Sequence, residues 1–166
     1  MHERVRRVHA ALREHGSTAE LVELPAPAPT AAETAAQLGC AVGAVANSLV
    51  FTVGGEPLLV LTSGAHRADT RLLARVLNVG RGRIRRADPG FVLAVTGQEV
   101  GGVAPVGHPR PVRTLVDVAL DDHDHVWAGA GLPHTVFRTT FTELLALTGG
   151  ESAVVADEGA GSAAQG

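Results

Sequence analysis

Two stretches rich in Leu, Val and Phe follow each other closely near the middle of the chain. Residues 47–54 read NSLVFTVG and residues 57–63 read PLLVLTS, with the turn Gly54-Gly55-Glu56 between them. Apolar runs of this length, separated by a glycine-containing turn, predict a β-hairpin. A strand that is apolar on both sides must be covered on both faces of its sheet. The hairpin is therefore expected at the centre of a sheet, with other parts of the chain packed on both sides.

The rest of the chain alternates between helical and strand patterns. Helices are indicated by apolar spacing and by capping residues, such as Thr30 with Glu33 three positions later. These helix and strand patterns together predict an α+β fold. We expect a single compact domain with a mixed central sheet of about six or seven strands flanked by helices. The predicted helices span 3–14, 30–38, 68–77, 88–96 and the stretch from Thr139 or Thr140 to Gly149, and the further strands 19–24, 83–86, 112–117, 124–128 and 134–138.

The domain is expected to occupy residues 1–150. Residues 151–166 are rich in Gly, Ala, Ser and acidic side chains, a composition typical of a disordered C-terminal tail. The arginines at the N-terminus are followed by no continuous apolar run, so neither a signal peptide nor a membrane span is predicted. A cytoplasmic location without a membrane partner is therefore expected.

The composition excludes several kinds of chemistry. All 14 basic residues are Arg, so no lysine can form a Schiff base or complete a GxxxxGK[ST] phosphate loop. Cys40 is the only cysteine, which rules out an intramolecular disulfide and a zinc site built from several cysteines. Asp121, Asp122, His123, Asp124 and His125 are adjacent rather than spaced to face one ion, so they predict an acidic, solvated turn. Neither a metal nor another cofactor is expected.

Positive charge is concentrated in residues 67–86. This segment contains seven arginines, opposed only by Asp69. Arginine binds phosphate through two parallel hydrogen bonds, so the segment could hold a nucleic-acid backbone. It could equally be the solvated face of a helix and an exposed turn.

The segment GGVAPVGHP, residues 101–109, predicts a shaped loop between regular elements. Its glycines allow close approach of a ligand, and successive backbone N–H groups could hold a carbonyl oxygen or a phosphate. A purely structural turn is the alternative. His108 ends this loop, and His66 and His134 also lie at the ends of predicted elements. A neutral imidazole can act as a general base near pH 7, so these three histidines are a weak indication of one pocket.

The order of elements and several motifs resemble the YbaK/EbsC family of free-standing aminoacyl-tRNA editing domains, which are related to the editing insertion of prolyl-tRNA synthetases. The resemblance covers about residues 3–150. It is carried by TAAETAAQLG (30–39), VANSLVF (45–51), PLLVLTSGAHRAD (57–69), the segment 94–108 ending in TGQEVGGVAPVGH, RTLVD (113–117) and HTVFRTTFTELLALTG (134–149).

The resemblance implies a small cavity against the sheet, in which backbone groups of Gly101 and Gly102 hold the ester and no metal is used. Many members carry a lysine where this chain has Asn47, which we expect to orient the substrate through uncharged hydrogen bonds. His108 is a candidate proton acceptor. The other residues expected to bind substrate are Ser63, His66, Ala104, Pro105, Gly107, Ala128, Gly129 and Thr135, and those expected to bind tRNA are Arg71, Arg75, Arg81, Arg83, Arg85 and Arg86.

The function that follows is that of a trans-acting deacylase, which hydrolyses the ester of a mischarged tRNA bearing a small amino acid. The expected partners are aminoacyl-tRNA and an aminoacyl-tRNA synthetase, with no DNA. A non-catalytic tRNA-binding or regulatory module is the alternative, because the family lysine is replaced by Asn47. A domain that binds or hydrolyses a small molecule without an RNA partner is a third.

Overall fold

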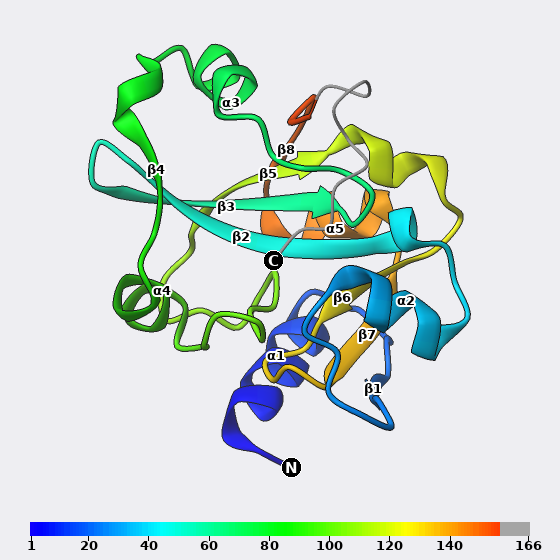
Figure 1. Ribbon diagram of the computed structural model, residues 1–166. Coiled ribbons are helices and arrows are strands. Elements are labelled where there is room, and N and C mark those ends of the chain that lie inside the picture. The colour runs from blue at the N-terminus through cyan, green and yellow to red at the C-terminus, as the bar shows by residue number, and fades with distance from the viewer. Residues whose placement is uncertain (157–166) are drawn as a thin grey trace.

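The computed structural model describes residues 1–156, which form one α+β domain built around a mixed β-sheet (Figure 1). The sheet order is β1-β7-β6-β2-β3-β5-β8, and β4 pairs with β2 off this path. The pairs β6–β2, β3–β5 and β5–β8 are parallel, and the others are antiparallel. The strands are β1 (Leu21–Glu23), β2 (Val45–Val53), β3 (Glu56–Ser63), β4 (Ile84–Arg86), β5 (Arg113–Asp117), β6 (Val126–Gly129), β7 (Thr135–Thr139) and β8 (Glu151–Ala153).

The α-helices begin where the sequence places capping side chains. Thr30 accepts a hydrogen bond from Glu33 N in α2, Asp88 accepts one from Phe91 N in α4, and Thr140 accepts one from Glu143 N in α5. The α-helices of residues 1–156 are α1 (Glu3–Glu14), α2 (Ala31–Leu38), α3 (Thr70–Leu77), α4 (Pro89–Thr96) and α5 (Phe141–Thr148), and three short 3₁₀ turns are η1 (Val42–Ala44), η2 (Arg81–Arg83) and η3 (Val118–Asp122).

The hairpin of β2 and β3 crosses the middle of the molecule and is buried on both faces, as the sequence predicts (Figure 1). On one face, Ala46 and Val50 of β2 join the core that includes residues of α1, α4 and α5. On the other face, Leu49 and Phe51 pack with α3, and Val45 packs with α2. Both faces of the strand are therefore covered, which explains why apolar and polar residues do not alternate along its sequence.

The outer edge of β2 is paired at its two ends but not between them. The beginning of the strand pairs with β6, where Val45 lies opposite Trp127 and Ala46 opposite Ala128. The end of the strand pairs with β4, which lies opposite residues 51–53. Among the strands of residues 1–156, none pairs with residues 47–49 on that edge.

The predicted boundary at residue 150 is too early. Residues 151–153 form β8, which pairs in parallel with β5, and Ala153, Val155 and Ala156 are buried. Residues 151–156 are therefore part of the fold, and β8 raises the strand number above the predicted six or seven. A three-residue edge strand next to a Gly-Gly pair has too little pattern to be recognised in the sequence. The rest of the predicted tail, residues 157–166, lies outside the described residues.

Gln98, at the end of α4, fixes the loop 101–109 from within the core. Its side chain is 1% exposed; its Oε1 accepts a hydrogen bond of 2.6 Å from Ala104 N and its Nε2 donates one of 3.3 Å to Val106 O. Thr96 Oγ1 donates to the backbone oxygen of Gln98 and accepts from its N–H. One buried amide side chain thus satisfies two backbone groups that would otherwise be buried without a partner.

Replacement of this amide by a hydrocarbon tests its importance to the fold. Gln98→Leu leaves Ala104 N–H and Val106 C=O unpaired, so the free energy of unfolding should fall by about 2–4 kcal/mol. The matched control is Gln37→Leu, because Gln37 also makes two hydrogen bonds to backbone, both with Ala26, but at a solvent-exposed position. Urea denaturation should show a loss below about 1 kcal/mol for the control. Equal small losses in both variants would contradict the assigned role.

Candidate functional site

A cavity of about 200 Å³ lies where the outer edge of β2 is unpaired. Figure 1 shows α2 close to β6 and β7 beside one end of β2, whereas β4 lies beside its other end. The walls of the cavity come from residues between 28 and 34, residues 45–49 of β2, Arg86 at the end of β4, residues between 100 and 103, and residues between 127 and 136. The predicted site residues that line it are Asn47, Arg86, Gly101, Ala128, Gly129 and Thr135.

Two neighbouring side chains of β2 supply polar atoms without partners. Asn47 Nδ2 and Ser48 Oγ are both shielded from solvent, and neither has a hydrogen-bond partner in residues 1–156. Thr62 Oγ1 is also shielded from solvent and has no hydrogen-bond partner in residues 1–156, and Thr62 is the cross-strand partner of Asn47. Buried polar atoms are usually paired, because leaving one unpaired costs about 1–3 kcal/mol. The unpaired atoms of Asn47 and Ser48 at a cavity wall therefore indicate a ligand that completes them.

The backbone of Ser48 also faces the gap. Successive residues of a strand direct their N–H and C=O groups to opposite edges. Val45 O accepts a hydrogen bond from Gly64 N beside β3, whereas Val50 O accepts one from Ala87 N on the β4 side. By this alternation, Ser48 N–H and C=O point to the outer edge, between β6 and β4. A ligand in the cavity can thus reach a backbone donor and a backbone acceptor.

The first two glycines of the predicted loop have different roles: Gly101 lines the cavity, and Gly102 packs behind it. Gly101 lines the cavity and has a φ of +91°, which glycine adopts without strain. Gly102 N donates to Glu99 O, so this N–H is already used inside the turn. Gly102 packs instead against the backbone of the next wall, where an added Cβ would lie 3.0 Å from Leu132 C. Gly101 therefore remains the candidate for ester binding, and Gly102 lets the two walls approach.

Thr135 and Gly129 hold the opposite wall in place. Thr135 Oγ1 donates to Leu132 O and accepts from Leu132 N, so the hydroxyl is occupied within the turn. Gly129 approaches Val103 O so closely that an added Cβ would lie 2.8 Å from that oxygen. Ala128, next to it, presents only a methyl group to the cavity. This wall therefore contributes shape rather than charge.

His108 lies behind the loop and does not line the cavity. Its Nε2 donates a hydrogen bond of 2.8 Å to Ala104 O. Burial lowers the pKa of the His108 imidazole, and the hydrogen bond to Ala104 opposes that shift. Ala104, Pro105 and Gly107 also lie outside the cavity lining. As placed, these residues support the loop that carries Gly101, and a proton-accepting role for His108 has no support from its position.

Ser63 and His66 lie at the end of β3, outside the cavity lining. His66 Nδ1 donates to Asp117 Oδ2 at 2.9 Å, and the same oxygen accepts from Ser63 N. Ser63 Oγ donates to Gly43 O. Asp117 is 1% exposed and also accepts from Ala119 N. This network joins the ends of β3 and β5, and it does not bring Ser63 or His66 to Asn47.

The predicted arginines form an exposed basic surface around α3, η2 and β4. Asp69 accepts a hydrogen bond from Arg71, and this bond holds the pKa of its carboxyl below the usual value. Arg86 differs from the rest, because it lines the cavity and carries the only charge among the described residues that do so. The members of the basic surface, all exposed, are Arg71, Arg75, Arg81, Arg83 and Arg85.

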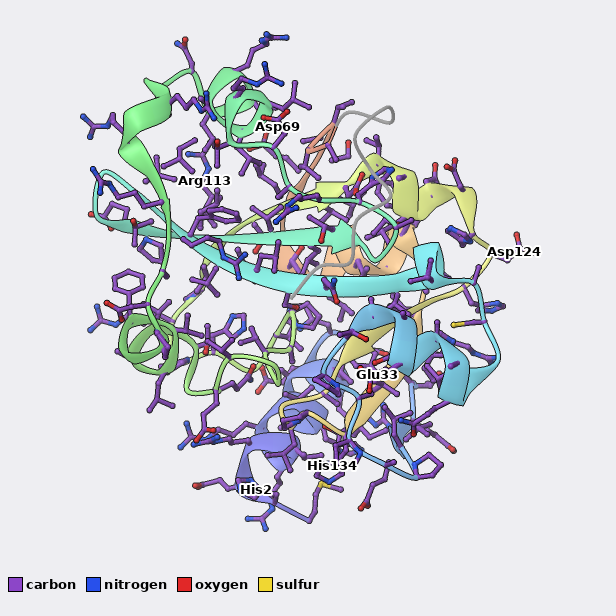
Figure 2. All side chains as sticks on the ribbon, viewed as in Figure 1. His2, Glu33, Asp69, Arg113, Asp124 and His134 are labelled. Atoms are coloured by element: carbon purple, nitrogen blue, oxygen red, sulfur yellow. The ribbon has the colours of Figure 1, made fainter. Side chains whose placement is uncertain are left out.

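The acidic turn 121–125 shows no arrangement for a metal. Figure 2 shows Asp124 at the outer edge of the molecule, pointing away from it. Among residues 1–156, no group of three or more His, Cys, Asp or Glu side chains is placed to hold a metal ion. No helix in the same part of the chain is long and apolar enough to cross a membrane.

Sequence reasoning missed several parts of the site. Ser48 had a usable signal, because Asn47-Ser48 is a polar pair inside a run that is otherwise apolar. Gln98 had none, since a single amide after a helix does not reveal which backbone groups it meets. Trp127 and Thr34 line the cavity from β6 and α2, which the fold alone brings together.

The model of the family described as "Aminoacyl-tRNA editing domain" matches residues 25–147 of the chain. The match includes every residue named above as lining the cavity. The chain belongs to the aminoacyl-tRNA editing domain family. The family match confirms the expected resemblance, and the structure confirms the α+β fold with a mixed sheet.

Individual relatives agree with this assignment. A crystal structure of a proposed trans-editing enzyme for prolyl tRNA synthetase superposes with a TM-score of 0.88 at 39% identity, covering 95% of this chain and 99% of that one. The uncharacterized protein YwhH of Bacillus subtilis (strain 168) is 25% identical over 126 residues, 75% of this chain and 78% of YwhH.

Longer relatives contain the domain as a part. A proline--tRNA ligase of Nitratidesulfovibrio vulgaris (strain DP4) is 32% identical over 123 residues, which are 74% of this chain and 21% of the ligase. The chain thus spans about a fifth of that ligase. Together, these relationships support a role in aminoacyl-tRNA editing of the deacylase type.

The contact between Gly129 and Val103 can be tested by adding one methyl group. Gly129→Ala must displace the loop, because its Cβ meets backbone rather than a flexible side chain. The free energy of unfolding should fall by about 1–3 kcal/mol in urea denaturation. Gly80→Ala is the matched control, since a Cβ there meets no atom within 4 Å. A Gly129 variant as stable as the Gly80 variant would show that the two walls are not in contact.

Proposed function

We propose that the chain is a trans-acting aminoacyl-tRNA deacylase, which hydrolyses the ester of a mischarged tRNA bearing a small amino acid. The observation that carries the proposal is the cavity at the unpaired edge of β2, with the unpartnered Asn47 Nδ2 and Ser48 Oγ in its wall. Its volume of about 200 Å³ and its wall of Ala46, Ala128 and glycines favour a small acyl group. Similarity over 95% of the chain to a proposed trans-editing enzyme supports action as a free-standing domain.

Uncharged donors would hold the reacting ester. In the proposed complex, Asn47 Nδ2 and the N–H groups of Ser48 and Gly101 surround the carbonyl oxygen, where negative charge develops during attack. A water molecule attacks the carbonyl carbon, and the bond from that carbon to the ribose oxygen breaks. The ribose oxygen gains a proton, and the amino acid is released with a free carboxyl group.

The described lining contains no carboxylate, imidazole or thiol that could accept a proton. The proton of the attacking water would therefore pass to solvent or to the neighbouring hydroxyl of the ribose. An aminoacyl ester is already reactive, so fixing the water and the ester in one geometry can supply much of the acceleration. This arrangement assigns Asn47 a positioning role without the charge of the family lysine.

The basic surface would hold the tRNA backbone. Its exposed arginines, from Arg71 to Arg85, carry charge on elements next to the end of the cavity that Arg86 marks. Phosphate contacts of this kind position a nucleic acid without reading its sequence. The similarity to proline--tRNA ligases supports prolyl-tRNA synthetase as the source of the mischarged tRNA.

A non-catalytic tRNA-binding module is the second candidate. Two observations favour it: the described lining contains no titratable proton acceptor, and Asn47 stands in place of the family lysine. Tight, salt-sensitive tRNA binding without turnover would identify this function.

The deacylase is tested with tRNA(Pro) charged with alanine, serine or cysteine. The wild-type protein should release at least one of these amino acids faster than spontaneous hydrolysis does. Asn47→Ala should slow that release by about a hundredfold to a thousandfold, because a donor to the developing negative charge is lost. Asn47→Asp keeps the shape but replaces the donor by a carboxylate, whose negative charge opposes the charge that develops on the carbonyl oxygen, so release should be at least as slow as in Asn47→Ala.

The control for these variants is Thr52→Ala, on the same strand but outside the cavity lining. It should keep the wild-type rate. The absence of acceleration by the wild-type protein with any of the three substrates would contradict the deacylase.

A further inference from the structure

Arg86 stands apart from the other arginines because of where β4 holds it. It lies opposite Phe51 in the antiparallel pairing of β4 with β2. Its guanidinium carbon lies 5.6 Å from the centre of the Phe51 ring, a distance at which a cation is attracted to the ring face. Phe51 is 2% exposed, so the platform under the guanidinium is fixed by the core.

The same pairing aligns Arg86 with the polar wall of the cavity. Phe51, Leu49 and Asn47 are alternate residues of β2 and therefore lie on one face of the sheet. The Cα path from Phe51 to Asn47 is roughly 13 Å, because a strand rises about 3.3 Å per residue. Arg86 and Asn47 nevertheless line the same cavity.

The electrostatics of the cavity favour an anion at Arg86. Every other described lining residue is uncharged, and Arg86 makes no ion pair with a carboxylate of residues 1–156. Its charge is therefore available to a ligand. A guanidinium can donate two parallel hydrogen bonds to one phosphate group, and this geometry suits a phosphodiester better than a carbonyl.

We propose that Arg86 forms a phosphate subsite at the mouth of the cavity, which binds the phosphate on the 5′ side of the terminal adenosine. This inference rests on the proposed function, since it places the ester of that adenosine at Asn47. It assigns the positive charge of the site to β4, at the 5′ phosphate of the same nucleotide whose ribose carries the ester, whereas many family members carry a lysine where this chain has Asn47. The other arginines then bind phosphates farther along the tRNA.

Binding of two small probes tests the subsite without any need for turnover. Adenosine 5′-monophosphate carries the proposed phosphate, and adenosine lacks it. Trp127 is the only tryptophan of the chain and lines the cavity, so its fluorescence reports binding there. At low salt, the wild-type protein should bind the monophosphate about tenfold more tightly than adenosine, a preference of about 1.4 kcal/mol.

Variants of two exposed arginines, one in the cavity lining and one outside it, make the test specific. Arg86→Gln should reduce the preference to near one, and Arg86→Lys should retain part of it. Arg113→Gln is the matched control, because Arg113, like Arg86, is an exposed arginine on a strand, but it does not line the cavity and is not part of the basic surface. It should keep the wild-type preference.

Two results would overturn the subsite. One is a wild-type protein that responds equally to both probes, including no response to either; the other is a preference that survives Arg86→Gln. Failure of the deacylase is a separate result. A protein with an Arg86-dependent preference but no hydrolysis of any aminoacyl-tRNA keeps the subsite and loses the proposed function.

Discussion

The unpaired edge of β2 is the constraint on which the site depends. A strand buried on both faces can receive a ligand only at its edge, and β6 and β4 cover that edge at its two ends. Between them, Asn47 and Ser48 present polar atoms that have no hydrogen-bond partner within residues 1–156. The cost of such groups is acceptable where a ligand completes them. The rest of the fold keeps the opening narrow, through glycine contacts between the loop 101–103 and the wall 129–133.

The uncharged polar groups and the positive charge of the cavity lie on different strands. Asn47 and Ser48 contribute uncharged polar groups to the wall at β2, and the charge among the described lining residues is on Arg86 at the end of β4. Two histidines outside the cavity lining make contacts within the fold instead: His108 donates a hydrogen bond to Ala104 O, and His66 joins the ends of β3 and β5 through Asp117. In the proposed function, a site with these properties would act by positioning, which suits an ester that is already reactive.

Much of the fold could be predicted from the sequence because its signals are local. The apolar hairpin, the capping residues Thr30, Asp88 and Thr140, and the glycine-proline loop each depend on neighbouring residues. The site was predicted only in part. Asn47, Gly101 and Ala128 line the cavity as expected, but His66 and His108 do not. Which side chains share a cavity depends on strand pairing and on long-range contacts such as those of Gln98, and neither spacing nor composition contains that information.

The most direct measurement of the central claim is nuclear magnetic resonance of the backbone amides during titration with a non-hydrolysable aminoacyl-adenosine analogue. The ligand should occupy the gap between β6 and β4, so the largest chemical-shift changes should come from Ser48, Gly101 and Ala128. The amides of His66 and Asp117, outside the cavity lining, should change little. Changes centred on His66 and Asp117, with Ser48 unaffected, would contradict the account.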